Sequence, residues 1–161
     1  MSRTLLKAVL SLLFALCASS ALAQMPNPYG APINLESAKK AAAAAAAEAR
    51  KNNWYMAIAI TDAGGELVYL EKMDITQTGS VKVAIGKARS AAMFKRPTKV
   101  WQDAVAGGGA GLRVLGLEGA VTIDGGLPIV MDGKIVGAIG VSGAAADQDA
   151  QCAKAGIDAL K

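Results

Sequence analysis

The spacing of apolar residues predicts an alternation of helices and short strands. Residues 35–53 are rich in alanine, Asn34 is placed to cap a helix, and Glu36 lies in its first turn. The seven alanines at 41–47 favour a helix held tight against a sheet, because alanine permits close approach at no cost in side-chain entropy. We therefore predict a first helix over 35–53.

A first hairpin is predicted next. Two apolar runs, 55–61 and 66–71, flank the turn sequence Asp62-Ala63-Gly64-Gly65. The first run is apolar almost throughout and predicts a central strand.

The last third of the chain predicts three more strands. A short strand is expected at 120–123, and the turn Asp132-Gly133 joins a strand at 128–131 to a longer one at 134–141. Pro128 cannot donate to a ladder, so its strand begins there or lies where no donor is needed.

Three further helices complete the pattern. Ser80 is placed to cap a helix that Pro97 ends, with Val81, Ile85, Ala88 and Ala92 on its buried side and Lys82, Lys87 and Arg89 elsewhere. Thr98 is placed to cap a short helix to 105, which leads into a glycine-rich, mobile or ligand-facing loop at 106–111. A helix over 144–161 closes the chain, so the whole predicts an α+β domain with one antiparallel sheet.

The first 23 residues have the features of a removable secretory signal. Arg3 and Lys7 precede an apolar run at 8–18, and Ala21-Leu22-Ala23 has the small-x-small form of a cleavage site. The apolar run is too short to span a bilayer. We expect cleavage after Ala23, a periplasmic or secreted protein without membrane insertion, and an extended arm at 24–33 before a single domain at 34–161.

The composition of the chain excludes several classes of function and catalytic mechanism. Without residues 1–23 the chain has 15 basic and 13 acidic residues, a balance that gives no reason to expect nucleic acid binding. It has no histidine, which excludes Ser-His-Asp and Cys-His mechanisms. Cys152 is then the only cysteine, so no internal disulfide forms.

The glycines at 137, 140 and 143 raise the question of a phosphate loop. Their G-x-x-G-x-x-G spacing matches neither a dinucleotide fingerprint nor a P-loop. On a strand, Gly137 and Gly140 face opposite sides and let neighbouring elements or a flat ligand approach. Ser142 and Gly143 lie at the start of the last helix, where free backbone donors are available to an anion.

Four stretches together resemble the GlcG/HbpS family, which includes the C-terminal domain of PduO-type proteins. They are "AIAITDAGGELVYLEKMD" at 57–74, "KARSAAMFKRPT" at 87–98, "GGLPIVMDGKIVGAIGVSGA" at 125–144 and "QDAQCAKAG" at 148–156. The resemblance implies a profilin-like α+β domain with a five-stranded antiparallel sheet flanked by helices, commonly assembled into homo-oligomers. Some members bind haem outside the cytoplasm and take part in redox or iron sensing.

Haem is the cofactor that the resemblance implies, and a chain without histidine must hold its iron through another atom. The candidate ligands are Thr98, Tyr55, Tyr69, Met93, Cys152 and Lys95. We favour the segment 93–98, with Thr98 as the axial ligand and Lys95 or Arg96 pairing with a propionate. The predicted binding residues are Met93, Phe94, Lys95, Arg96, Thr98, Ser142 and Gly143. The alternative is that Met93 and Phe94 are core residues, Lys95 and Arg96 solvated helix-end charges, and Thr98 a cap.

A second hypothesis is a binding protein or enzyme for a small organic acid or related metabolite. Carboxylates near the turns and two arginines supply acid–base groups and anion partners. They are Asp62, Glu71, Asp74, Asp124, Arg89 and Arg96. Acids beside turns usually serve the turn itself, so most of these carboxylates are expected to be structural.

Overall fold

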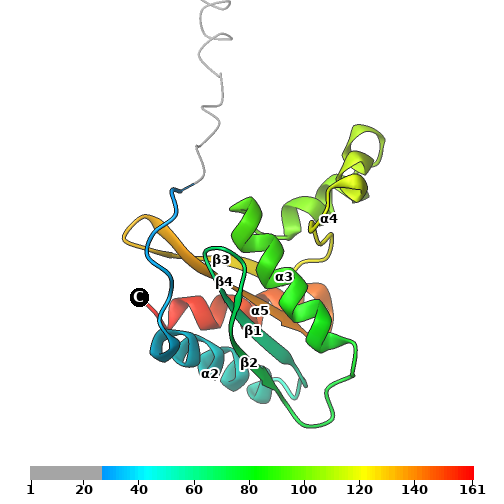
Figure 1. The fold of residues 1–161 in the computed structure, drawn as a ribbon. Coiled ribbons are helices and arrows are strands. Elements are labelled where there is room, and N and C mark those ends of the chain that lie inside the picture. Colours follow the sequence, from blue (N-terminus) through cyan, green and yellow to red (C-terminus); the bar gives the residue numbers. More distant parts are fainter. Residues whose placement is uncertain (1–26) are drawn as a thin grey trace, which may run out of the picture.

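The computed structural model describes residues 27–161, and the signal segment predicted for residues 1–23 lies outside the described residues. These residues form one antiparallel sheet with the strand order β2-β1-β4-β3 (Figure 1). The strands are β1 Ala57–Asp62, β2 Leu67–Lys72, β3 Gly126–Met131 and β4 Lys134–Ser142. Helix α3 (Ser80–Phe94) covers one face, and helices α2 (Leu35–Lys51) and α5 (Ala146–Asp158) cover the other. The predicted α+β class is confirmed.

Helix α2 forms where the alanine-rich stretch predicts it. The Asn34 side chain accepts a hydrogen bond from the Ser37 N–H at 2.8 Å, which caps the helix as expected. Six alanines of α2 are fully buried against the sheet and α5. The small side chains therefore serve close packing.

Both predicted hairpins are present, each within about two residues of the expected bounds. Strand β1 is central and pairs with β2 and β4. Pro128 lies on the edge strand β3 opposite Ala138, where a missing N–H costs no ladder bond. Gly140 allows α3 to approach, since a Cβ there would lie 2.1 Å from the Ala84 carbonyl oxygen.

The prediction of a fifth strand at 120–123 is wrong. This segment runs along α3 instead of joining the sheet, with the Val121 N–H donating to Ser90 Oγ at 3.1 Å. Ile123 is 48% exposed, so its apolar side chain does not face the core. A short apolar run favours a strand in a sequence, but it does not show by itself what it packs against.

Of the two caps predicted for the middle helices, Ser80 is wrong and Thr98 is correct in position only. Gly79 occupies the cap position of α3, and Ser80 is a buried first-turn residue. Thr98 precedes helix α4 (Lys99–Ala106) but makes no capping hydrogen bond. Both hydroxyls point into the protein because their positions are covered by other elements.

Two segments of the chain lie outside the sheet and the three helices that cover it. Residues 27–33 run alongside β4, with the Gly30 and Ile33 N–H groups donating to the Ile135 and Val136 carbonyl oxygens at 2.8 Å. Helix α4 and the 3-10 helix η1 (Gly109–Gly116), which takes up the second half of the predicted loop at 106–111, project away from the sheet (Figure 1). No helix within residues 27–161 is long and apolar enough to cross a membrane.

Candidate functional site

Helix α3 separates the predicted site residues into two groups. Its first residue, Ser80, lies beside Ser142 at the end of β4, while its last turn contains Met93 and Phe94. The rise of an α-helix places Ser80 and Met93 about 20 Å apart. The structure therefore does not bring Ser142 and Gly143 together with the 93–98 segment.

Met93 lies in an open cavity at the C-terminal end of α3, which we call the Met93 cavity. Tyr29, Ala63, Gly64 and Met93 line it, and its volume is about 460 Å³. The Met93 side chain is 48% exposed and crosses the β1–β2 turn, where a Cβ on Gly65 would lie 3.2 Å from Met93 Cγ. The thioether is therefore accessible from solvent, and Met93 is not a core residue.

Tyr29 lines this cavity, and Lys95 lies against the Tyr29 ring. The Tyr29 hydroxyl donates to the carbonyl oxygens of Ala92 and Met93 at 2.9 and 3.1 Å. Lys95 is left-handed, with φ 56°, and its Nζ lies 4.1 Å from the centre of the Tyr29 ring. Loss of hydration raises the pKa of the Tyr29 phenol above its ordinary value. The phenol is therefore a neutral donor at neutral pH.

Phe94 and Arg96 do not line the cavity and instead contact Trp101 of helix α4. The rings of Phe94 and Trp101 meet edge to face, with centres 5.5 Å apart. Arg96 lies over the Trp101 ring at 4.8 Å, and its Nε donates to the Phe94 carbonyl oxygen at 2.9 Å. These contacts give both residues a structural role at the base of α4.

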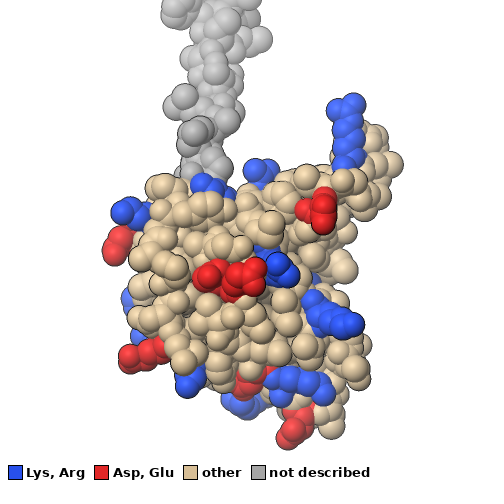
Figure 2. Space-filling view, viewed as in Figure 1, with Lys and Arg blue, Asp and Glu red and all other residues tan. Residues whose placement is uncertain are grey.

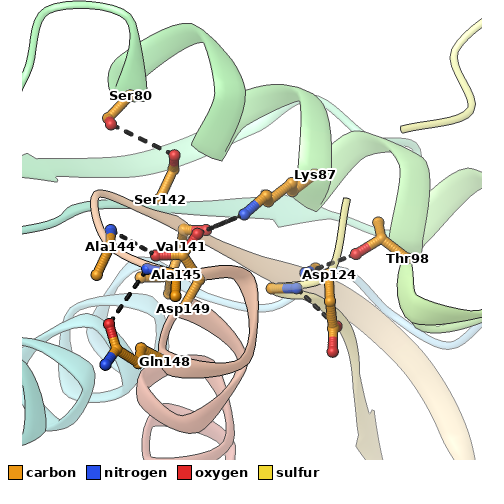
Figure 3. Close-up of polar contacts among 12 residues, drawn as sticks. Ser80, Lys87, Thr98, Asp124, Val141, Ser142, Ala144, Ala145, Gln148 and Asp149 are labelled. Carbon is orange, nitrogen blue, oxygen red and sulfur yellow. Dashed lines mark hydrogen bonds and ion pairs between the residues drawn. The ribbon is translucent and has the colours of Figure 1, made fainter. Parts of the chain in front are cut away.

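Thr98 is completely buried, and its placement does not support its prediction as the axial ligand. Its Oγ1 accepts a hydrogen bond from the Gly126 N–H at 2.9 Å (Figure 3). A Cβ on Gly126 would lie 2.7 Å from Thr98 Cγ2, so no space for a ligand exists on that side. Iron has no path to this hydroxyl in the described conformation.

Ser142 and Gly143 likewise face protein. Ser142 is buried, and its Oγ donates to Ser80 Oγ at 3.4 Å. A Cβ on Gly143 would lie 2.1 Å from the Tyr55 carbonyl oxygen, so glycine is needed for packing. The anion at the start of α5 is the protein's own carboxylate, because Asp149 Oδ1 accepts from the Ala144 N–H at 3.1 Å.

The buried ion pair of Lys87 and Asp149 is a feature that sequence reasoning missed. Lys87 Nζ lies 2.7 Å from Asp149 Oδ2 and donates to the Val141 carbonyl oxygen at 3.0 Å (Figure 3). Both side chains are at most 3% exposed, so the prediction that Lys87 lies away from the buried side of α3 is wrong. Burial raises the pKa of Asp149 above its ordinary value, although Lys87 and neighbouring N–H groups act against it.

One sequence signal marks Lys87 as buried. Lys87 lies three residues after Ala84 and four before Ala91, so the three share the helix face that meets the sheet. Gly125 and Gly126 make the necessary space, since a Cβ on Gly125 would lie 2.9 Å from Lys87 Nζ. The glycine pair at 125–126 therefore accommodates a lysine and a threonine.

The remaining ligand candidates lie apart from the Met93 cavity. Tyr55 lines a second cavity of about 350 Å³ with Arg50, Glu71, Lys72, Met73 and Asp74. Tyr69 packs against the hydrophobic core. Cys152 is fully buried, and desolvation raises the pKa of its thiol to about 12, which makes it inert.

The charged candidates of the small-acid hypothesis are mostly engaged with their own neighbours. Asp62 Oδ1 accepts from the N–H groups of Gly64 and Glu66, as turn chemistry requires. Glu71 pairs with Arg50 at 3.3 Å. Asp124 is buried, and its Oδ1 accepts from the Gly125 N–H at 2.7 Å. Arg89 is half-exposed and lies 3.5 Å from Glu66, on the side of α3 that carries Met93.

Comparison with known proteins places these observations in a family. The model of a family described as "Haem degrading protein HbpS-like" matches residues 33–158. Protein GlcG of Escherichia coli strain K12 is 40% identical over 95 residues, which are 59% of this chain and 69% of GlcG. The crystal structure of HbpS is 31% identical, with a TM-score of 0.75 over 82% of this chain and 92% of that one. The crystal structure of the PduOC:Heme complex is 27% identical, with a TM-score of 0.72 over 80% of this chain and 94% of that one. The chain therefore belongs to the GlcG/HbpS family.

Proposed function

We propose that this protein binds haem in the Met93 cavity. The observation that carries the proposal is the half-exposed thioether of Met93 in an open cavity, in a chain of the HbpS-like family. A structure of similar fold, PduOC, was solved as a complex with heme. A thioether is an established axial ligand of haem iron, and histidine is absent from this chain.

The residues around Met93 suit a flat, apolar, dianionic group. The Tyr29 ring and the backbone of Ala63 and Gly64 supply apolar and aromatic surface. Lys95, and Arg89 one turn before Met93 on α3, supply cations for propionates. Bound haem supplies redox-active iron. The protein's own contribution is to hold the group at the surface, where solvent and other proteins reach it.

We also propose a location and a role for the protein. The predicted signal segment at residues 1–23 supports a periplasmic or secreted protein, and a solvent-accessible haem supports a part in haem, iron or redox sensing. Cell fractionation and mass determination of the mature N-terminus test the location. Retention of the uncleaved chain in the cytoplasm would contradict it.

A hemin titration tests the binding proposal. We expect a shifted, saturable Soret band, and a Met93→Ala variant should bind hemin at least about tenfold more weakly, since it loses the axial ligand and part of the cavity wall. Met131→Ala is the matched control, because Met131 is 37% exposed but does not line the Met93 cavity. A spectrum identical to that of free hemin would contradict haem binding.

A third variant distinguishes Met93 from Thr98 as the iron ligand. Thr98→Val removes the hydroxyl and keeps the side-chain volume, so hemin affinity should be unchanged if Met93 is the ligand. The opposite result would be loss of the Soret shift in a folded Thr98→Val variant while Met93→Ala binds hemin as the parent protein does. That result would identify Thr98 as the ligand. Circular dichroism checks the fold in each case.

A further inference from the structure

The N-terminal arm, residues 27–33, runs alongside β4 and carries Tyr29 to the Met93 cavity. The residues before and after Tyr29 make two strand-like hydrogen bonds with Ile135 of β4, at 2.9 and 2.8 Å. The arm is also anchored at its far end, where Ile33 is buried in the hydrophobic core. The sheet therefore holds the backbone of Tyr29 in place and presents its side chain to the end of α3.

The Tyr29 hydroxyl supplies a hydrogen-bond donor that helix α3 lacks at its C-terminal end. The last carbonyl groups of a helix have no partner within the helix. The residue four positions after Met93 is Pro97, which has no N–H to donate to the Met93 carbonyl oxygen. That oxygen accepts from the Tyr29 hydroxyl at 3.1 Å instead, and the Ala92 carbonyl oxygen accepts from it at 2.9 Å. The phenol therefore fixes the turn of α3 from which the thioether projects.

The Tyr29 ring holds a cation beside the same cavity. Lys95 Nζ lies 4.1 Å from the centre of the ring, within the range of a cation–π contact. A free lysine side chain has many rotamers, and the contact limits them. On the face drawn in Figure 2, Lys and Arg side chains are scattered and form no continuous basic patch. An anionic ligand on this face therefore depends on individual cations that are held in place.

We propose that Tyr29 is a positioning residue of the haem site, and that through it the docked N-terminal arm and haem binding stabilise each other. The inference rests on the proposed function and adds the arm to its site. Tyr29 fixes the two groups that haem requires, the Met93 thioether for the iron and the Lys95 ammonium group for a propionate. The ring lines the cavity only while the arm is docked. The docked arm therefore favours haem binding, and haem binding favours the docked arm by the same factor.

Hemin titrations of three variants of the full chain test the positioning role. Tyr29→Leu removes the hydroxyl and the ring but keeps an apolar side chain, and it should weaken hemin binding at least about tenfold, because both groups lose their support. Tyr29→Phe keeps the ring and should weaken binding about two- to fivefold. Tyr55→Leu is the matched control, because Tyr55 is 48% exposed, close to the 44% of Tyr29, and does not line the Met93 cavity. This control should bind hemin as the parent protein does.

A double-mutant cycle separates positioning from a direct contact between haem and the tyrosine. Lys95→Met should weaken hemin binding about three- to tenfold in the parent protein, because it removes the propionate partner. In the Tyr29→Leu background the same change should have less than about a twofold effect, because the ammonium group is no longer held. Equal effects in the two backgrounds would overturn the positioning of Lys95 by Tyr29.

Hydrogen exchange tests the reciprocal effect without relying on the haem spectrum. The Gly30 N–H donates to β4, so its exchange reports whether the arm is docked. Saturating hemin should slow this exchange at least about tenfold in the parent protein, and the slowing should be absent in Tyr29→Leu. Circular dichroism checks that each variant is folded.

The outcomes distinguish this inference from the haem proposal. A parent protein that leaves the hemin spectrum unchanged would contradict haem binding, and this inference with it. Hemin binding that Tyr29→Leu does not weaken, or that leaves the Gly30 amide unprotected, would overturn this inference alone. The haem proposal would then stand on Met93 without the arm.

Discussion

Side chains that could bind a ligand lie towards both ends of helix α3, but one group is buried and the other is exposed. Towards its N-terminal half, Lys87, Asp149, Ser80 and Ser142 form a buried polar cluster in which the groups pair with one another. At its C-terminal end, the Met93 cavity leaves a thioether open to solvent, and the Lys95 ammonium group lies nearby on the Tyr29 ring. Both regions contain residues that the sequence suggests as ligands.

The difference between them is how far their polar groups are already satisfied. A buried charge is tolerated only when it is paired and hydrogen-bonded, and the lysine and aspartate of the buried polar cluster are already bound to each other and to the backbone. At the Met93 cavity, water completes the hydrogen bonding and an incoming group can replace it. Residue type alone therefore does not identify a binding site, whereas unsatisfied and accessible groups do.

The largest expected difference in reactivity is between two sulfur atoms, the buried thiol of Cys152 on α5 and the exposed thioether of Met93 on α3. Burial raises the pKa of the Cys152 thiol from 9.0 to about 12, which lowers its thiolate fraction near pH 8 roughly a thousandfold relative to the unfolded chain. Alkylation by iodoacetamide, followed by mass spectrometry, should therefore be slow in the native protein and fast in urea. Comparable rates in the two states would show that this part of the molecule is open.

Methionine oxidation tests whether the Met93 cavity is open to solvent. Met93 is 48% exposed and Met56 is fully buried beside Gly143, so hydrogen peroxide should oxidise Met93 first. Bound hemin should then protect Met93. Equal oxidation of the two methionines would remove the distinction between an open and a closed end.

The second largest effect is expected from breaking the buried ion pair. Lys87→Met leaves the Asp149 carboxylate buried without its cation, which should lower the free energy of unfolding by about 3–5 kcal/mol in urea at pH 7. The double variant with Asp149→Leu should recover much of that loss, because an apolar pair needs no compensation. Lys154→Ala, which removes an exposed partner of Asp158, is the control and should have no measurable effect.

The same variant has a defined pH dependence. Burial raises the pKa of Asp149 in the native state, and removal of Lys87 removes a group that lowers it. A carboxyl with a raised native pKa binds a proton more readily when folded, so its contribution to stability is fully present below its unfolded pKa and is lost as the pH rises. The deficit of Lys87→Met should therefore shrink from pH 7 towards pH 4. A constant deficit would contradict the assignment of the loss to an unpaired carboxylate.

An intermediate effect is expected from filling the space beside Lys87. A Cβ on Gly126 would lie 2.4 Å from the Lys87 carbonyl oxygen, so Gly126→Ala should lower the free energy of unfolding by about 1–3 kcal/mol. Gly79→Ala is the matched control, because no atom lies within 4 Å of its Cβ position and its backbone is helical. That control should be neutral or slightly stabilising, by up to about 1 kcal/mol. Equal losses in the two variants would argue against tight packing at residue 126.

The fold could be predicted largely from local sequence signals. The alanine-rich helix with its Asn34 cap and both turn-closed hairpins depend on neighbouring residues, and they are present as expected. The errors at Ser80, Thr98 and 120–123 share a different cause. Each of these segments is covered by an element distant in sequence, and a local pattern carries no information about such a neighbour.

The site could be predicted only in part, for the same reason. The segment 93–98 is predicted as the site because a thioether, an aromatic ring, two cations and a hydroxyl occur together in it. The structure distributes those side chains in three directions, leaving Met93 and Lys95 at the cavity and Thr98 in the interior. Tyr29 was missed, because its contact with the end of α3 joins residues 63 and 64 positions apart in the sequence.

The smallest effect is expected from the Tyr29 hydroxyl, which fastens the extended residues 27–33 to the Met93 cavity. Tyr29→Phe removes its two hydrogen bonds but keeps the ring beside Lys95, so the local opening of this segment should become easier by about 0.5–1.5 kcal/mol. Native-state hydrogen exchange at the Gly30 and Ile33 amides should then accelerate roughly two- to tenfold, with the core amides of β1 unchanged. Tyr55→Phe is the control, because within residues 27–161 the Tyr55 hydroxyl makes no hydrogen bond, and exchange at the same two amides should not change. Unchanged exchange in Tyr29→Phe would mean that the backbone bonds to β4 hold the segment by themselves. Tyr29 in the wall of the Met93 cavity would then owe its position to the backbone bonds with β4 and not to its phenol.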